Sequence, residues 1–276
     1  MAGLEFRRDL YRGTAHDYDR YRVPYPRSLI DDLAERTGAS GAAGRGRLLD
    51  LACGTGQVTF ALASRFGEVW AVDQEPDMTS LVAQKARAAG LGHIQVLTST
   101  AEDLPAPDSS FDLVAIGNAF HRLPRAAVAA SALRWLRPGQ FLALLYSGDN
   151  PWQGEAPWQR AMAQVVGFWM ARSGGRERIP PGYEQDRRER PDRLVLAEAG
   201  FELLGAHQFP AGHAWTTETL TGLVFSTSVL SRAALGGQAK DLEADLRREL
   251  RDYELAGGLP ETIGFAYELA RRPLQV

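Results

Sequence analysis

The chain has 276 residues and a mass of 30.2 kDa, and its 31 basic and 34 acidic residues give a net charge of −3. This balance disfavours a nucleic-acid-binding protein, because neutralising phosphates normally requires a basic face. Cys53 is the only cysteine, which excludes an intramolecular disulfide framework and a zinc site built on several thiolates. We find no apolar stretch of the length of a membrane span or a secretory signal, and therefore expect a cytoplasmic protein without a membrane partner.

Short apolar runs alternate with helical patterns from residue 47 onward. Near-continuous apolar strands that alternate with helices indicate a parallel sheet covered on both faces. A helix at 27–36 and a Gly-, Ala- and Ser-rich linker at 37–46 precede this pattern. The predicted strands are 48–51, 69–72, 94–97, 113–116 and 141–145, and the predicted helices between them are 58–65, 76–89 and 125–135.

The regular alternation ends after residue 146. Residues 151–190 are rich in Trp, Pro, Gly and Arg, and we interpret them as an insertion over the carboxyl edge of the sheet. The remaining predicted elements are helices at 155–170, 192–199, 217–235 and 239–253 and strands at 201–209 and 262–269.

A glycine loop, Asp50-Leu51-Ala52-Cys53-Gly54-Thr55-Gly56, follows the first predicted strand. Glycines at this place let the backbone turn sharply and approach a ligand closely. Asp73 ends the second strand, where a carboxylate can accept hydrogen bonds from both ribose hydroxyls of a nucleoside. The two features predict a nucleoside site at the strand ends.

Two known phosphate-binding loops, the dinucleotide loop and the Walker loop, fit this part of the sequence less well. The dinucleotide loop G-x-G-x-x-G needs a third glycine where this chain has Thr59, and Asp50 would repel a pyrophosphate but suits an ammonium or a backbone amide. The Walker loop needs a Lys-Ser or Lys-Thr pair that the chain lacks here. A ligand with a cationic amino-acid end therefore fits better than NAD, which disfavours an oxidoreductase.

Residues 48–56 resemble motif I of the class I S-adenosylmethionine-dependent methyltransferases, in particular the ubiquinone/menaquinone-biosynthesis-like small-molecule group (methyltransferase type 11). The resemblance continues to residue 146. It implies an α/β fold, a doubly wound, seven-stranded Rossmann-like sheet with an antiparallel last strand and helical cap insertions. The further matching segments are Val72-Asp73-Gln74, 100–105, 111–114, Asn118-Ala119-Phe120-His121 and 136–140.

The resemblance divides the chain into a core and a cap. We expect one methyltransferase domain over 1–276. Its parts are an N-terminal cap segment at 1–44, a cofactor-binding core at 45–150, cap insertions at 151–190 and 211–258, and remaining core at 191–210 and 259–276.

The resemblance also implies S-adenosyl-L-methionine as the cofactor and S-adenosyl-L-homocysteine as the product. Asp73 then binds the ribose, Met78 packs on the adenine, and Arg22 pairs with the methionine carboxylate; alternatively, the tyrosines around Arg22 pack on the helix at 27–36. The implied cofactor-binding residues are Tyr21, Arg22, Asp50, Ala52, Gly54, Gly56, Asp73, Gln74, Met78, Thr100, Ala101, Glu102 and Asn118.

Two residues depart from the family pattern. Ala52 replaces a glycine often found in motif I, which is tolerable if its φ angle is negative. Thr100 stands where an aspartate often contacts the adenine amino group, so the Thr100 hydroxyl, the Ala101 backbone or Glu102 would take this contact.

His121 is the candidate catalytic residue. At the carboxyl end of the fourth strand, an imidazole with an unperturbed pKa near 6.5 could accept a proton from the acceptor, or it could only shape the pocket.

Cys53 is predicted to be a packing residue because no base lies near it in sequence. The other histidines lack the spacing of metal ligands, so we expect no metal.

Tryptophans concentrate in the insertion at 151–190. They could line a flat apolar pocket for an aromatic acceptor, although helix packing is the alternative explanation. The candidate substrate-pocket residues are Tyr25, Phe120, Trp152, Trp169, His213 and Trp215.

These features predict methyl transfer to a small acceptor, aromatic or from specialised metabolism, on carbon, oxygen or nitrogen. The alternatives are a non-catalytic protein that keeps the cofactor fold, an RNA methyltransferase and a nucleotide-dependent oxidoreductase. The sequence leaves the oligomeric state open.

Overall fold

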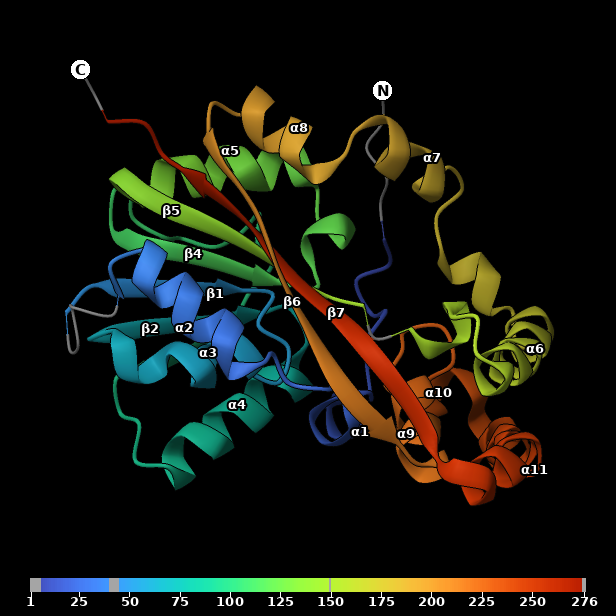
Figure 1. Cartoon of the computed structure of the whole chain (residues 1–276). Coiled ribbons are helices and arrows are strands. Elements are labelled where there is room, and N and C mark those ends of the chain that lie inside the picture. The colour runs from blue at the N-terminus through green and yellow to red at the C-terminus, as the bar shows by residue number, and fades with distance from the viewer. Residues whose placement is uncertain (1–5, 40–44, 149, 275–276) are drawn as a thin grey trace.

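The structure, a computed structural model, describes residues 6–39, 45–148 and 150–274. Its centre is a seven-stranded sheet in the order β3-β2-β1-β4-β5-β7-β6 (Figure 1). Strands β1 to β5 pair in parallel, and β7 runs antiparallel between β5 and β6. This confirms the predicted Rossmann-like sheet. The strands are β1 (Arg47–Leu51), β2 (Glu68–Asp73), β3 (Ile94–Thr98), β4 (Phe111–Gly117), β5 (Leu136–Ser147), β6 (Glu202–Trp215) and β7 (Leu259–Arg271).

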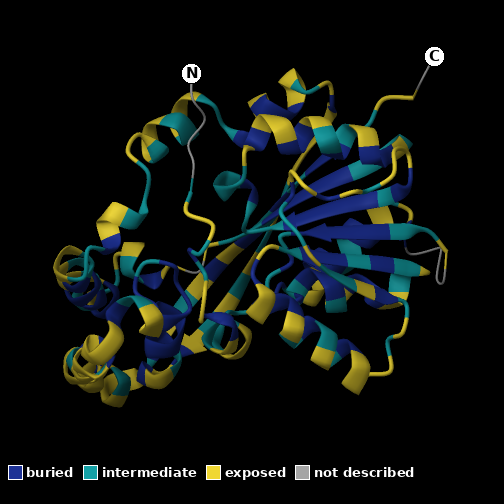
Figure 2. Ribbon diagram, turned by 180° about the vertical axis from the view of Figure 1, so that it is seen from behind, coloured by how far each residue is buried: buried dark blue, intermediate teal, exposed yellow. Residues whose placement is uncertain are grey.

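Helices cover both faces of the sheet, because neighbouring apolar residues of each buried strand point to opposite sides. Leu48 packs in the same cluster as α2, α3 and α4, whereas Leu49 packs with α5 and α8. Figure 2 shows the central strands as buried and the outer faces of the helices as exposed. These helices are α2 (Arg27–Arg36), α3 (Gln57–Leu62), α4 (Pro76–Ala88), α5 (Arg125–Trp135) and α8 (Asp192–Glu198).

The remaining helices gather beyond the carboxyl ends of the parallel strands (Figure 1). Helix α6 packs on α11, and α9 packs on both α11 and α1. We call α6, α9, α10 and α11 the helical cap. The helices outside the two sheet layers are α1 (Ala15–Tyr21), α6 (Pro157–Arg172), α7 (Tyr183–Glu189), α9 (Thr217–Phe225), α10 (Arg232–Leu235) and α11 (Ala239–Gly257).

Two sequence predictions for the second half of the chain were wrong, and two further helices of the chain were missed. The helix predicted at 217–235 is broken, because the hydroxyls of Ser226 and Thr227 donate to the carbonyls of Leu223 and Val224 and end α9. Strand β6 continues to Trp215 instead of ending at residue 209, since it pairs with β7 along its whole length. Helices α1 and α7 were not predicted.

Some predictions fall outside the described residues. These are residues 1–5 of the N-terminal cap segment, 40–44 of the linker, 149 of the core and the last two residues of the chain. Within the described ranges, no helix is both long enough and apolar enough to span a membrane.

Candidate active site

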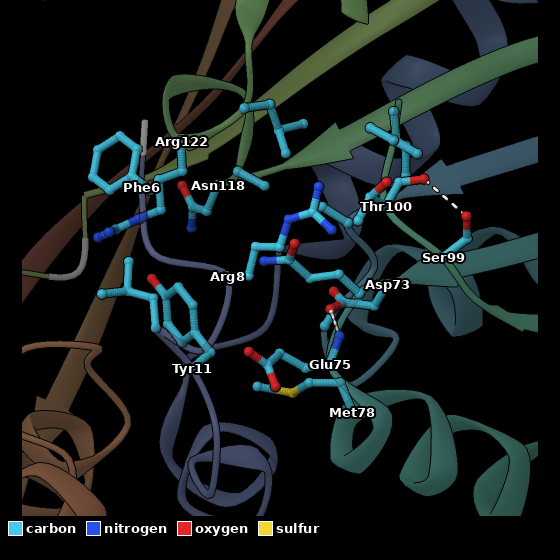
Figure 3. Close-up of a pocket in the computed structure, with 18 of the residues that line it drawn as sticks. Phe6, Arg8, Tyr11, Asp73, Glu75, Met78, Ser99, Thr100, Asn118 and Arg122 are labelled. Atoms are coloured by element: carbon cyan, nitrogen blue, oxygen red, sulfur yellow. Dashed lines mark hydrogen bonds between the residues drawn. The ribbon is translucent and has the colours of Figure 1, made fainter. Parts of the chain in front are cut away.

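A cavity of about 360 Å³ opens at the carboxyl ends of β1 to β4, where the strand order of the sheet reverses. Its volume lies in the range of small-molecule sites, about 300–1,000 Å³. Figure 3 shows the side chains that converge on it. The wall consists of Phe6, Arg7, Arg8, Leu10, Tyr11, Tyr18, Leu51, Ala52, Gly54, Asp73, Gln74, Glu75, Met78, Ser99, Thr100, Ala101, Glu102, Gly117, Asn118, Ala119, Arg122, Leu123 and Pro124.

The loop after β1 brings backbone to the cavity without a bulky side chain. Gly54 has φ +53°, a left-handed conformation, and lies on the wall. Gly56, with φ +88°, lies behind it, where an added Cβ would come within 2.7 Å of the Phe60 ring. Both glycines are therefore required by the turn, although only Gly54 faces the cavity.

Ala52 departs from the sequence expectation. Its φ is +55°, whereas the sequence prediction required a negative angle for an alanine at this position. A Cβ in the left-handed region crowds the following carbonyl and costs roughly 1–2 kcal/mol. The chain keeps Ala52 on the cavity wall in spite of this strain.

Asp73 is the best-positioned acid of the cavity. Its Oδ2 accepts a hydrogen bond from the Gly54 amide at 2.8 Å, and its Oδ1 accepts one from the Glu75 amide at 2.9 Å. Burial raises the pKa of this carboxyl, although the two amides oppose the shift. The carboxylate is thus fixed in orientation, with lone pairs left for a ligand on the cavity side.

Thr100 and its neighbours form the part of the cavity wall that follows β3. The Thr100 hydroxyl donates to Asp103 Oδ2 at 2.8 Å and accepts from the Asp103 amide at 3.1 Å. Its donor proton is therefore used within its own loop. Met78, buried at the start of α4, and the Ala101–Glu102 backbone lie on the same wall.

Asp50 lies beneath the loop and not on the wall. It is buried, and its Oδ2 accepts a hydrogen bond from the Thr59 hydroxyl at 2.5 Å. Burial raises the pKa of Asp50 to about 7 against the effect of Thr59. The neighbouring Cys53 thiol is also buried and its pKa is raised well above the usual value, which agrees with packing and not with nucleophilic chemistry.

Asn118 joins the ends of β4 and β5. Its φ is +50°, which asparagine tolerates better than most residues. The backbone N–H of Asn118 donates to the Leu145 carbonyl at 2.9 Å. Its side-chain Oδ1 accepts from the backbone N–H of Ser147, also at 2.9 Å. These bonds hold the loop after β4 against the cavity.

The two cofactor-binding residues predicted from the N-terminal cap segment lie off the wall. Arg22 Nε donates to the Ser226 hydroxyl at 2.9 Å, and its guanidinium lies 5.0 Å from the centre of the Tyr18 ring. Tyr21 packs on the backbone of Gly222, and its hydroxyl lies 3.5 Å from a Glu218 carboxylate oxygen. Their side chains face α9 in this structure.

His121 lies in a 3-10 turn, Phe120–Arg122, behind the wall. Burial lowers the pKa of His121 to about 3, and the charges of Arg122, Arg187 and Arg125 add to the shift. Its ring centre lies 6.1 Å from that of Tyr183. The expected ordinary pKa near 6.5 was wrong, because the sequence does not reveal this burial or these arginines.

The candidate aromatic pocket is not assembled. Trp169 and Trp215 are buried in the core, and their indoles donate to Asp245 at 2.9 Å and Glu261 at 2.6 Å. Packing among helices, the alternative explanation, accounts for these rings. The other candidates also lie off the cavity wall: Phe120 in the core near α5, Trp152 against the core near α6, His213 on Trp215, and Tyr25 against Phe265.

Sequence reasoning missed several parts of the wall. Residues 6–11 carry no motif, and only their place in the fold shows that they reach the cavity. Arg122 to Pro124 directly follow His121, so extending the loop after the fourth strand would have found them. Glu75, two residues after Asp73, was also missed; burial raises the pKa of its carboxyl.

Comparisons with known proteins agree with this geometry. A family model described as a methyltransferase domain matches residues 48–139. The chain is 32% identical over 211 residues to an uncharacterized methyltransferase of Mycobacterium tuberculosis, covering 76% of this chain and 73% of that protein. It is 30% identical over 165 residues to a demethylmenaquinone methyltransferase of Thermus thermophilus, covering 57% and 74%.

A solved structure assigned to a type II methyltransferase of Anaeromyxobacter dehalogenans has the same fold. Its TM-score is 0.63 at 22% identity, and the match covers 92% of this chain and all of that one. The chain therefore belongs to the class I methyltransferases, in the ubiquinone/menaquinone-like group. It is an enzyme of the methyltransferase class, as the sequence predicted.

Proposed function

We propose that this protein transfers a methyl group from S-adenosylmethionine to a small organic acceptor. The observation that carries the proposal is the Asp73 carboxylate, held by two amides on the wall of a 360 Å³ cavity at the strand ends. A carboxylate in this setting suits the paired hydroxyls of a ribose. The narrow Gly54 turn beside it leaves room for a thioether or sulfonium chain.

The residues on the wall fit this cofactor. Asp73 would hold the ribose, Met78 and Leu123 would contact the adenine faces, and the backbone of Ala52 and Asn118 would border the amino-acid end. When bound, S-adenosylmethionine supplies a methyl group on a sulfonium, which is already a strong electrophile. The protein's work is to align the acceptor and exclude water.

Alignment of the acceptor with the methyl group explains why the reaction needs no strong base at the cavity. His121 lies behind the wall, and a pKa of about 3 makes it a weak proton acceptor. Well-oriented reactants alone can lower a barrier by several kcal/mol. An acceptor that ionises before binding would need no base from the protein.

Calorimetric titration tests the cofactor assignment. We expect S-adenosylmethionine and S-adenosylhomocysteine to bind, and NAD not to bind. A methylation assay with demethylmenaquinone, the compound in the name of one relative, tests the acceptor. Binding of NAD alone would contradict the proposal, and cofactor binding without turnover on a broad panel of small acceptors would favour the non-catalytic alternative.

A further inference from the structure

One end of the cavity is lined by side chains that the proposed cofactor contacts do not use. In Figure 3, Phe6 and Arg122 lie with Asn118 at one end of the cavity, whereas Ser99 and Thr100 lie at the other end. The proposed cofactor contacts include Asn118 but neither Phe6 nor Arg122. These two side chains are therefore left for the acceptor.

Arg122 and Tyr183 form two sides of a slot that holds the Phe6 ring. The Arg122 guanidinium lies over the face of this ring, 5.5 Å from its centre. Tyr183 of α7 packs edge-on against it, with ring centres 5.4 Å apart and an angle of 85° between the planes. Tyr183 is held in turn by Arg187, whose Nη1 donates to its hydroxyl at 3.3 Å. A cation on one face and a second ring at the edge are the favourable surroundings of a bound aromatic ring.

Phe6 does not satisfy all the groups of this slot. The Nε of Arg122 is buried and has no hydrogen-bond partner among the described residues. A phenyl ring carries no oxygen or nitrogen that could accept a hydrogen bond from this donor. Because an unpaired buried donor is unfavourable, a ring with an oxygen substituent would fit the slot better than Phe6 does.

The segment that carries Phe6, residues 6–12, is free to move away without breaking the sheet. In the described part of the chain, its backbone hydrogen bonds only close local turns, such as the bond from the Leu10 amide to the Arg7 carbonyl at 3.3 Å. Arg7 also pairs with Asp9 of the same segment, with Nη2 2.9 Å from Oδ2. Removing Phe6 from the slot therefore costs mainly its contacts with Arg122 and Tyr183.

We propose that Phe6 occupies the place of the acceptor's ring, between Arg122 and Tyr183, and leaves it when a hydroxylated aromatic acceptor enters. This inference rests on the proposed function and adds residues that select the acceptor. The acceptor's ring lies over the guanidinium, and its oxygen accepts a hydrogen bond from Nε. Phe6 determines specificity, because only a ligand that binds the slot better than the phenyl ring displaces it.

Two probes of similar size distinguish a ring site from a general apolar cavity. 2-Naphthol has flat aromatic rings and a hydroxyl, whereas decahydro-2-naphthol has the same carbon skeleton and hydroxyl without aromatic electrons. Binding is measured by calorimetry on the full chain saturated with S-adenosylhomocysteine, which carries no methyl group to transfer. We expect the saturated alcohol to bind roughly 2- to 30-fold more weakly than 2-naphthol.

Removing the competing ring should improve binding of the aromatic probe. We expect Phe6→Ala to bind 2-naphthol roughly 2- to 10-fold more tightly than the wild type, since no aromatic pair has to be broken first. Phe168→Ala is the matched control, because Phe168 is an exposed phenylalanine of α6 that lies off the cavity wall. It should leave both affinities unchanged.

The role of the cation is tested in the Phe6→Ala background, where Arg122 no longer holds a protein ring. Adding Arg122→Gln should weaken 2-naphthol by roughly 2- to 30-fold and leave the saturated alcohol nearly unchanged, whereas Arg122→Lys should keep part of the affinity. Arg251→Gln, at an exposed arginine of α11, is the control and should change neither affinity. Binding of S-adenosylhomocysteine by each variant checks that it is folded.

Three results would overturn the inference. They are 2-naphthol binding to Phe6→Ala no more tightly than to the wild type, equal affinities of the two probes, or equal losses for both probes when Arg122→Gln is added. A protein that binds S-adenosylhomocysteine but no 2-naphthol, even as Phe6→Ala, would also overturn it and leave the proposed function standing. A wild-type protein that does not bind S-adenosylhomocysteine would instead defeat the proposed function itself.

Discussion

The carboxylate of Asp73 accepts the amide of Gly54 at 2.8 Å, so the ends of β1 and β2 are joined beside the cavity. One side chain therefore both shapes the loop and faces the cavity. The acid and the glycine are 19 residues apart, and the parallel pairing of β1 with β2 brings them together.

Replacing this acid should impair binding of the nucleoside. Asp73→Ala removes the proposed acceptor for two ribose hydroxyls, and hydrogen bonds to charged groups contribute about 1.5–3 kcal/mol each. We expect S-adenosylhomocysteine to bind at least about 100-fold more weakly in calorimetry. Asp77→Ala, at an exposed acid in the first turn of α4, is the matched control and should bind normally. Equal losses in both variants would exclude a specific role for Asp73.

The strained alanine of the loop gives a second prediction. At φ +55°, Ala52→Gly removes the Cβ clash, and we expect a net gain of about 1 kcal/mol in the free energy of unfolding. The melting temperature should rise by about 2–4 °C. Ala130→Gly, at an exposed position inside α5, should change stability by about the same amount in the opposite sense. A loss of stability in Ala52→Gly would show that the turn does not strain the alanine.

Motif and periodicity sufficed for the parallel strands and for the part of the cavity wall that follows their carboxyl ends. Asp73, Gly54 and Asn118 could be placed because each lies at or just after the carboxyl end of a buried strand, and the ends of parallel strands meet at one edge. The spacing of these residues is set by the fold itself, so it survives in the sequence.

The features that could not be predicted depend on contacts between residues far apart in the chain, and such contacts leave no pattern in the local sequence. Trp169 has the same helical spacing whether it lines a pocket or fills a core, and only its contact with Asp245 of α11 decides. Arg8 reaches the cavity because Phe6 and Tyr11 dock on Arg122, more than a hundred residues away. The length of β6 depends likewise on its partner β7.

His121 predicts an acid-dependent loss of stability. Burial and three arginines lower its pKa to about 3, below the ordinary value of 6.5. Between these two pH values the unfolded chain binds a proton that the folded protein does not. The stabilising contribution is therefore complete above about pH 6.5 and falls as the pH falls, by at most ~1.4 kcal/mol per pH unit.

His121→Gln removes this titration. We expect the difference in unfolding free energy between wild type and variant to shrink steadily as the pH is lowered from 7 to 4, measured by urea denaturation at each pH. Comparing the two proteins cancels the other titrating groups, such as Asp50, whose raised pKa acts in the opposite sense. A difference that stays constant with pH would contradict the buried neutral imidazole.

The last prediction concerns a buried ion pair that joins α5 to the segment of α7 and α8. Arg125 Nη1 donates to Asp192 Oδ1 at 2.7 Å and its Nη2 to Asp186 Oδ2 at 2.6 Å, while the Tyr146 hydroxyl donates to the other Asp192 oxygen at 3.0 Å. Both Arg125 and Asp192 are more than nine-tenths buried. Removing one partner would leave the other charge in a low-dielectric site.

Arg125→Ala should therefore lower the free energy of unfolding by about 3–5 kcal/mol, measured by chemical denaturation. Arg134 lies on the same helix as Arg125, and Arg134→Ala breaks an exposed pair with Asp108, which should cost at most about 1 kcal/mol. The double variant Arg125→Met with Asp192→Leu removes both charges and should recover most of the loss, because a well-packed apolar pair can replace a buried ion pair. If the single Arg125 variant were as stable as Arg134→Ala, the pair would not hold α7 and α8 against the sheet.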